Sequence, residues 1–176
     1  IPAGRGGASV VWHDNRVAAA NDIYAQRVNA AGVPLWTANG VAICTAAGSQ
    51  NNYRLVSDGA GGAIVAWTDS RSGVNDLYVQ RVHGSGSVMW TANGVALCTA
   101  TGSQLSPAIA SDGAGGAIVA WTDQRGSYDN VYARRVNASG TPQWTANGIP
   151  LYSTDKAHQG LSQIVSDGEH GAVIVW

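Results

Sequence analysis

The most chemically suggestive feature of this 176-residue sequence is a Trp-x-Asp-x-Arg motif that occurs three times. The acid and the base are two residues apart, which places both side chains on one face of an extended segment, where they can form an ion pair. The three pairs are Asp14/Arg16, Asp69/Arg71 and Asp123/Arg125. Each pair could simply order a loop at the end of a strand. Alternatively, the three pairs could be identical polar sockets that bind a repetitive ligand, such as a glycan or an acidic peptide.

These two interpretations of the Asp/Arg pairs predict different results for one substitution. If the pairs are sockets, Arg71→Ala abolishes glycan binding and leaves the melting temperature nearly unchanged. If the pairs are structural, the same substitution lowers the melting temperature strongly.

The other residues that could do chemistry form no recognisable catalytic or metal-binding pattern. The four histidines share no repeated motif and no metal-ligand spacing. Each Asp-Gly-x-Gly-Gly-like turn offers one carboxylate, whereas a calcium loop needs several oxygen ligands. The sequence contains neither a Gly-Lys-Ser/Thr phosphate loop nor a Gly-x-Ser-x-Gly nucleophile elbow. We therefore expect a protein that is not an enzyme and that holds neither a metal nor a cofactor.

The chain is built from internal repeats. Segments such as VAWTDSR and VAWTDQR recur at a nearly constant spacing, as do PLWTANGVAICT and VMWTANGVALCT. The repeats run over 13–67, 68–121 and 122–176, and residues 1–12 match the end of a repeat, so we expect a piece of a longer array. Six tryptophans recur at two positions and are expected to pack between repeats as core: Trp12, Trp36, Trp67, Trp90, Trp121 and Trp144.

Each repeat is predicted to form four short antiparallel strands. In one repeat these strands cover 107–110, 117–121, 130–136 and 141–152, separated by Gly- and Asn-rich turns. Such a sheet cannot bury two faces alone, so successive sheets must stack. The sequence therefore predicts an all-β fold, a β-propeller with four-stranded blades. Residues 1–176 would supply three blades and part of a fourth, as a segment of a larger propeller. A β-solenoid is the alternative, but its coils are usually shorter.

Two sets of motifs resemble known propeller families. The order SDG…AIVAWTDxR…DxYxxRV resembles the repeat of TolB-like bacterial propellers. The Gly-x-x-x-Trp pairs Gly32/Trp36, Gly86/Trp90 and Gly140/Trp144 resemble the tryptophan-docking motif of quinoprotein propellers, in which the Trp of one blade packs against a Gly-containing turn of a neighbour. The chain lacks the vicinal Cys-Cys pattern of that family, so the resemblance implies no quinone. It implies a bacterial protein that is secreted, periplasmic or displayed at the cell surface.

Composition excludes several classes of partner. Ten Lys and Arg residues against eleven Asp and Glu residues leave no basic excess to attract nucleic acid. No apolar run approaches the length of a membrane span, so no membrane insertion is expected. The leading expectation is a non-catalytic module for binding or adhesion, with a protein or glycan ligand at the propeller loops.

Two alternatives to this function stay open. One is a structural repeat that builds an inter-chain ring or an extended assembly by self-association through open blade faces. The other is a non-catalytic part of a larger secreted hydrolase.

Overall fold

The protein is all-β, as the repeats predict. The computed structural model describes residues 1–3, 6–16, 20–152, 157–160 and 163–176. In this part of the chain the strands are β1 (Ala8–Asp14), β2 (Asp22–Val28), β3 (Val41–Cys44), β4 (Gln50–Ser57), β5 (Ala63–Asp69), β6 (Asp76–Val82), β7 (Val95–Cys98), β8 (Gln104–Ser111), β9 (Ala117–Asp123), β10 (Asn130–Val136), β11 (Ile149–Tyr152), β12 (Gln163–Ser166) and β13 (Ala172–Val175).

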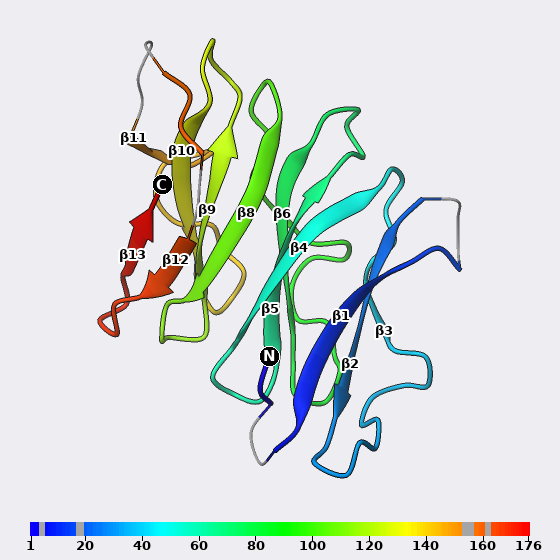
Figure 1. The fold of residues 1–176 in the computed structure, drawn as a ribbon. Coiled ribbons are helices and arrows are strands. Elements are labelled where there is room, and N and C mark those ends of the chain that lie inside the picture. The colour runs from blue at the N-terminus through cyan, green and yellow to red at the C-terminus, as the bar shows by residue number, and fades with distance from the viewer. Residues whose placement is uncertain (4–5, 17–19, 153–156, 161–162) are drawn as a thin grey trace.

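These strands form four antiparallel sheets that follow one another in chain order (Figure 1). The first sheet holds β1–β3, the second β4–β7, the third β8–β11, and the fourth β12 and β13. Within each sheet, strands that are consecutive in sequence are hydrogen-bonded neighbours. The second and third sheets therefore each span about one repeat length, but the expected repeat bounds at 67/68 and 121/122 fall inside β5 and β9, so each sheet combines the end of one repeat with the start of the next.

Local sequence explains the strands and their turns. The segment AIVAWTD forms β5 and again β9, and every residue in both strands is buried, as expected for a central strand covered on both faces. The preceding hairpin turn is held by Asp58, whose carboxylate Oδ1 accepts hydrogen bonds from the backbone N–H groups of Ala60 and Gly62, both at 2.8 Å. Asp112 holds the equivalent turn of the third sheet in the same way.

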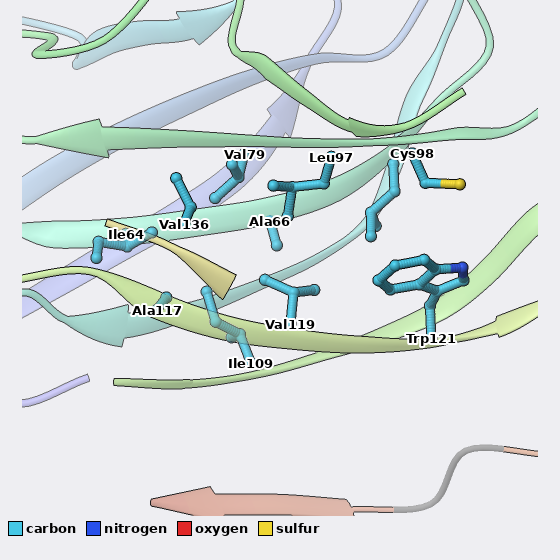
Figure 2. Packing of buried hydrophobic residues seen from close by; sticks show 11 residues of the cluster. Ile64, Ala66, Val79, Leu97, Cys98, Ile109, Ala117, Val119, Trp121 and Val136 are labelled. Carbon is cyan, nitrogen blue, oxygen red and sulfur yellow. The ribbon is translucent and has the colours of Figure 1, made fainter. Parts of the chain in front are cut away.

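The sheets pack face to face through apolar side chains. Figure 2 shows this packing between the second and third sheets, where Ile64, Val79 and Leu97 from one sheet meet Val119 and Trp121 from the next. A similar cluster joins the first and second sheets, and a smaller one lies between the third and fourth. The core is therefore divided among the interfaces between sheets and does not form a single centre.

Four of the repeated tryptophans contribute to this core directly. Trp67 and Trp121 are completely buried near the ends of β5 and β9, Trp36 is 8% exposed, and Trp90 is half-buried. Trp12, in the first sheet, is half-buried as well, whereas Trp144 is 46% exposed.

The tryptophans before β3 and β7 dock onto a turn of the following sheet. The indole N–H of Trp36 donates to the carbonyl of Gly84 at 3.0 Å, and that of Trp90 donates to the carbonyl of Ala138 at 3.1 Å. Gly86 and Gly140 lie on these rings, where a Cβ atom would come within 2.9 and 2.5 Å of the ring carbon Cγ. The ring therefore requires glycine in the turn.

The exposure of Trp144 has a simple physical reason. It occupies the position of Trp36 and Trp90, but the described residues contain no turn of a following sheet to cover it. At the other end, Gly32 is the counterpart of Gly86, and a Cβ on Gly32 would meet nothing within 4 Å. Each end of the described stack thus carries one unmatched half of the docking contact.

Candidate functional site

All three Asp/Arg pairs predicted from the sequence are formed, and they occupy equivalent places in successive sheets. The aspartates are the last residues of β1, β5 and β9, and each arginine follows two residues later in the connection to the next strand. The structure therefore places one pair in each of the first three sheets and does not gather the three into one site.

The pair in the second sheet has a dense set of hydrogen bonds around a buried carboxylate. Asp69 is completely buried. Its Oδ1 accepts from the backbone N–H of Arg71 at 3.0 Å and from Arg71 Nε at 2.9 Å, while Oδ2 accepts from Arg71 Nη2 at 2.6 Å. The indole N–H of Trp67 also donates to Oδ2, at 2.9 Å. In the Trp-x-Asp-x-Arg motif, the Trp and the Arg therefore both donate hydrogen bonds to the carboxylate between them.

The guanidinium of Arg71 reaches beyond its own aspartate. Its Nη2 donates to the carbonyl of Asn93 at 2.8 Å and lies 3.3 Å from Sγ of Cys44, which belongs to the preceding sheet. Its Cζ stands 3.9 Å above the ring of Tyr78, a cation–π contact. We refer to Trp67, Asp69, Arg71, Tyr78 and Cys44, with the Asn93 carbonyl, as the arginine cluster of the second sheet.

The third sheet repeats this cluster closely. Arg125 bonds Asp123 through Nε at 2.7 Å and Nη2 at 2.6 Å, and its Nη2 also donates to the carbonyl of Asn147 at 2.8 Å. Cys98 Sγ lies 3.3 Å from the same nitrogen, and the Tyr132 ring lies 3.9 Å below Cζ. The cluster is therefore a unit that occurs in both of the four-stranded sheets.

The first sheet has the same pair in a more open setting. Arg16 pairs with Asp14 through Nε at 2.8 Å and through Nη2, and stacks 4.3 Å over Tyr24. No preceding sheet covers it among the described residues, and the Arg16 side chain is 39% exposed, against 23% for Arg71. The hydrogen bonds from Arg16 lower the pKa of Asp14 well below its ordinary value.

Burial and hydrogen bonding act in opposite directions on the groups of the cluster. Burial disfavours the Asp69 anion, but the hydrogen bonds from Arg71 and Trp67 outweigh it, so the pKa of Asp69 is lowered. For Cys44 and Cys98, burial dominates and raises the thiol pKa to about 11. Both cysteines are free and buried, so at neutral pH they are small apolar thiols.

A second set of ion pairs was not predicted from the sequence. Arg81 donates to Asp58 Oδ2 from Nε at 3.0 Å and from Nη2 at 2.9 Å, and Arg135 donates to Asp112 from Nε at 2.9 Å and pairs through Nη2 at 2.8 Å. The two pairs connect the hairpin turn before the second strand to the third strand. The sequence does contain a pattern that could have revealed these pairs. The aspartate of each SDG motif is followed 23 residues later by the arginine of an RV motif, as in Asp58/Arg81 and Asp112/Arg135.

The structure also contains a groove that the sequence motifs do not mark. It has a volume of about 380 Å³ and lies along β4, β8 and β12, the first strands of three successive sheets. Its lining residues are Arg54, Leu55, Ser106, Pro107, Ala108, Ile109, Gln163 and Ile164.

Bulges shape two walls of this groove. In β4, Asn51 pairs with Thr68 but Arg54 pairs with Ala66, so an extra residue is inserted, and Asn52 there has a φ of 51°. The same irregularity in β8 gives Ser106 a φ of 49°. A bulge interrupts the pairing and re-aims the neighbouring side chains, which is a recurrent device beside binding sites.

The groove lining differs from one repeat to the next. The arginine clusters use the same residue types in each sheet, but the position of Arg54 is taken by Ala108 in the next repeat and by Gln163 in the one after. The bulge residue Asn52 is replaced by Ser106. The repeats therefore keep their structural residues and the apolar lining position of Leu55, Ile109 and Ile164, and they vary the lining at the position of Arg54 and at the bulge.

No family model matches the chain, and no relative was found among curated proteins. Within the residues that the structure describes, no group of three His, Cys, Asp or Glu side chains is arranged to hold a metal ion. The same part of the chain contains no helix that is long and apolar enough to cross a membrane.

Proposed function

We propose that this chain is a β-propeller segment that acts as a non-catalytic binding module. The first strands β4, β8 and β12 lie side by side, whereas β3, β7 and β11 are the last strands of their sheets. This order supports blades arranged around an axis, with the first strands innermost. The motifs that suggest a secreted or cell-surface bacterial protein support that location through resemblance alone.

The observation that carries the binding function is the groove with varied lining on an otherwise repeated scaffold. The polar groups of the arginine clusters are occupied by one another, since Arg71 already contacts a carboxylate, a carbonyl, a thiol and a ring. This geometry favours the structural interpretation of the pairs. The groove lining, by contrast, combines a cation, an amide and a hydroxyl with apolar side chains, the mixture typical of ligand sites.

A glycan array probed with the wild-type chain and a groove-filling variant tests this function. Gln163 is exposed and lines the groove, so Gln163→Trp is expected to fill it and to remove the binding of the wild type. Val10→Trp is the control, because Val10 is exposed on β1, the first strand of its sheet, and does not line the groove. Binding that survives Gln163→Trp would show that the ligand lies elsewhere, for example at the Asp/Arg pairs.

A second candidate function, assembly with other copies, is favoured by the exposed apolar residues at one end of the stack. These are Trp144, Tyr152, Val165, Val173, Val175 and Trp176, each between 46% and 58% exposed. Exposed apolar surface of this kind commonly becomes an interface. We propose that the chain self-associates through its end sheets, and multi-angle light scattering should show dimers or larger species that Trp144→Ser weakens. A stable monomer at high concentration would contradict this proposal.

A further inference from the structure

Among the described residues that line the groove, Arg54 is the one cationic group, and it is available to a ligand. Most of the other described arginines already have partners. Two of them donate to backbone carbonyls of other elements, namely Arg27 and Arg134. Five more pair with carboxylates: Arg16, Arg71, Arg81, Arg125 and Arg135. Arg54 is exposed, and its guanidinium donates only to the carbonyl of the adjacent Tyr53, at 2.9 Å, within the described part of the chain. Its remaining N–H donors can therefore bind a carboxylate in the groove.

The charge around Arg54 favours an anion. None of the described lining residues is acidic, so no lining carboxylate competes for the guanidinium. A planar guanidinium can hold a carboxylate through two parallel hydrogen bonds. The groove thus has one fixed point of attachment for a negatively charged ligand.

The rest of the lining matches a polyhydroxylated ring. The Ser106 hydroxyl and the Gln163 amide lie on the two neighbouring strands and make no hydrogen bond with any other described residue. Each can both donate and accept, as pairing with sugar hydroxyls requires. Leu55 and Ala108 are half-buried apolar residues of the same lining, and the exposed part of each side chain can contact the C–H face of a pyranose ring.

We propose that this groove binds a sugar acid, with the guanidinium of Arg54 pairing with the carboxylate of a uronic acid residue. This inference rests on the proposed binding function and specifies its ligand class. Because β4, β8 and β12 each supply one polar group, recognition needs three successive repeats. The sequence differences between the repeats are consistent with this role, since identical repeats would not place a cation on β4, a hydroxyl on β8 and an amide on β12.

The test compares sugars that differ in charge. Glucuronate and galacturonate are titrated into the wild-type chain at low ionic strength, followed by NMR, with glucose and galactose as neutral controls. We expect the uronates to bind at least about tenfold more tightly than the neutral sugars, and the difference to shrink as salt is added. Equal binding of charged and neutral sugars would overturn the role of Arg54.

Variants then locate the site. Arg54→Gln is expected to abolish the preference for uronates, whereas Arg54→Lys should keep part of it. Neither substitution removes an ion pair between described residues, so unfolding curves should match those of the wild type. Arg16→Gln is the control for the loss of one positive charge outside the groove; it breaks the pair with Asp14, so its unfolding curve is measured as well, and it should bind as the wild type does. Loss of binding in Arg16→Gln but not in Arg54→Gln would overturn the proposal.

Two further outcomes separate this inference from the function on which it rests. Binding of a Glu-containing peptide in place of uronates, still dependent on Arg54, would refute the sugar acid and retain the binding module. Absence of binding to uronates, to the glycan array and to the acidic peptide would refute both.

Discussion

Replacement of Asp69 by asparagine separates the structural role of the arginine cluster from a ligand-binding role. Asparagine keeps nearly the same size but has no charge, and one of its two terminal groups is an N–H donor. In the wild type, Oδ1 and Oδ2 of Asp69 accept four N–H groups, three from Arg71 and one from Trp67. The variant leaves at least one of these donors facing another donor and leaves the guanidinium without its counter-charge.

The expected loss of stability follows from the burial of the two partners. Breaking a buried ion pair by removing one partner costs about 3–5 kcal/mol. Because the Arg71 side chain is 23% exposed, water can solvate part of the released charge, and we expect about 2–4 kcal/mol. For a chain of this length that corresponds to a fall in melting temperature of roughly 5–15 °C.

The matched control for this substitution is in the same chain. Asp14→Asn removes the corresponding contacts from Trp12 and Arg16 in the first sheet, where Arg16 is 39% exposed, so its loss of stability should be clearly smaller. Thermal and urea unfolding of both variants, followed by tryptophan fluorescence, measures the difference. Equal and small effects of the two substitutions would refute the structural role of the buried cluster.

The pH dependence adds a second readout to the same experiment. Since the pKa of Asp69 is lowered in the folded protein, its contribution is fully present above the ordinary aspartate pKa of about 4. The contribution is lost as the pH falls through the lowered folded value. The unfolding free energy of Asp69→Asn should therefore decline less in acid than that of the wild type.

Three other perturbations test the fold. Gly86→Ala should lower the unfolding free energy by about 2–4 kcal/mol, because the added Cβ would meet the docked indole. Gly32→Ala should lower it by only about 1 kcal/mol, since this Cβ adds the same left-handed backbone strain but meets no neighbouring atom. Equal losses for the two variants would contradict the docking contact. Burial and the nearby negative charge of Asp14 raise the pKa of Asp22, so the charged form of Asp22 destabilises the folded protein. In urea unfolding, Asp22→Asn should therefore raise the unfolding free energy by about 1 kcal/mol near pH 7 and leave it unchanged near pH 3. With thiol pKa values of about 11, Cys44 and Cys98 should resist alkylation at pH 8 until the protein is unfolded, and rapid labelling of the native chain, read by mass spectrometry, would contradict their burial.

Much of the fold could be predicted from the sequence because it depends on local chemistry. Alternating and continuous apolar runs define the strands, and Asp-Gly turns define the hairpins, as Asp58 and Asp112 show. The Asp/Arg pairs were predictable for the same reason, since a spacing of two residues brings the side chains together whatever surrounds them.

Most contacts between sheets were beyond the reach of these local rules, and the docking of Trp36 and Trp90 on Gly-containing turns was expected from the family resemblance alone. The approach of Cys44 to Arg71 and the burial of Trp36 but not of Trp144 depend on which sheet covers which face. The Asp58–Arg81 pair recurs at a fixed spacing in sequence, but only the antiparallel strand order brings its members together.

The sequence by itself determined that the chain is a repeat of β-strands with paired Asp and Arg side chains and tryptophans in register. Only the tertiary structure decided that those pairs are occupied by their own surroundings and that Arg54, Ser106 and Gln163 line one groove. The physical reason is that pairing along one strand is fixed by near neighbours in the chain, whereas a surface made from the first strands of three different repeats exists only once the sheets have stacked.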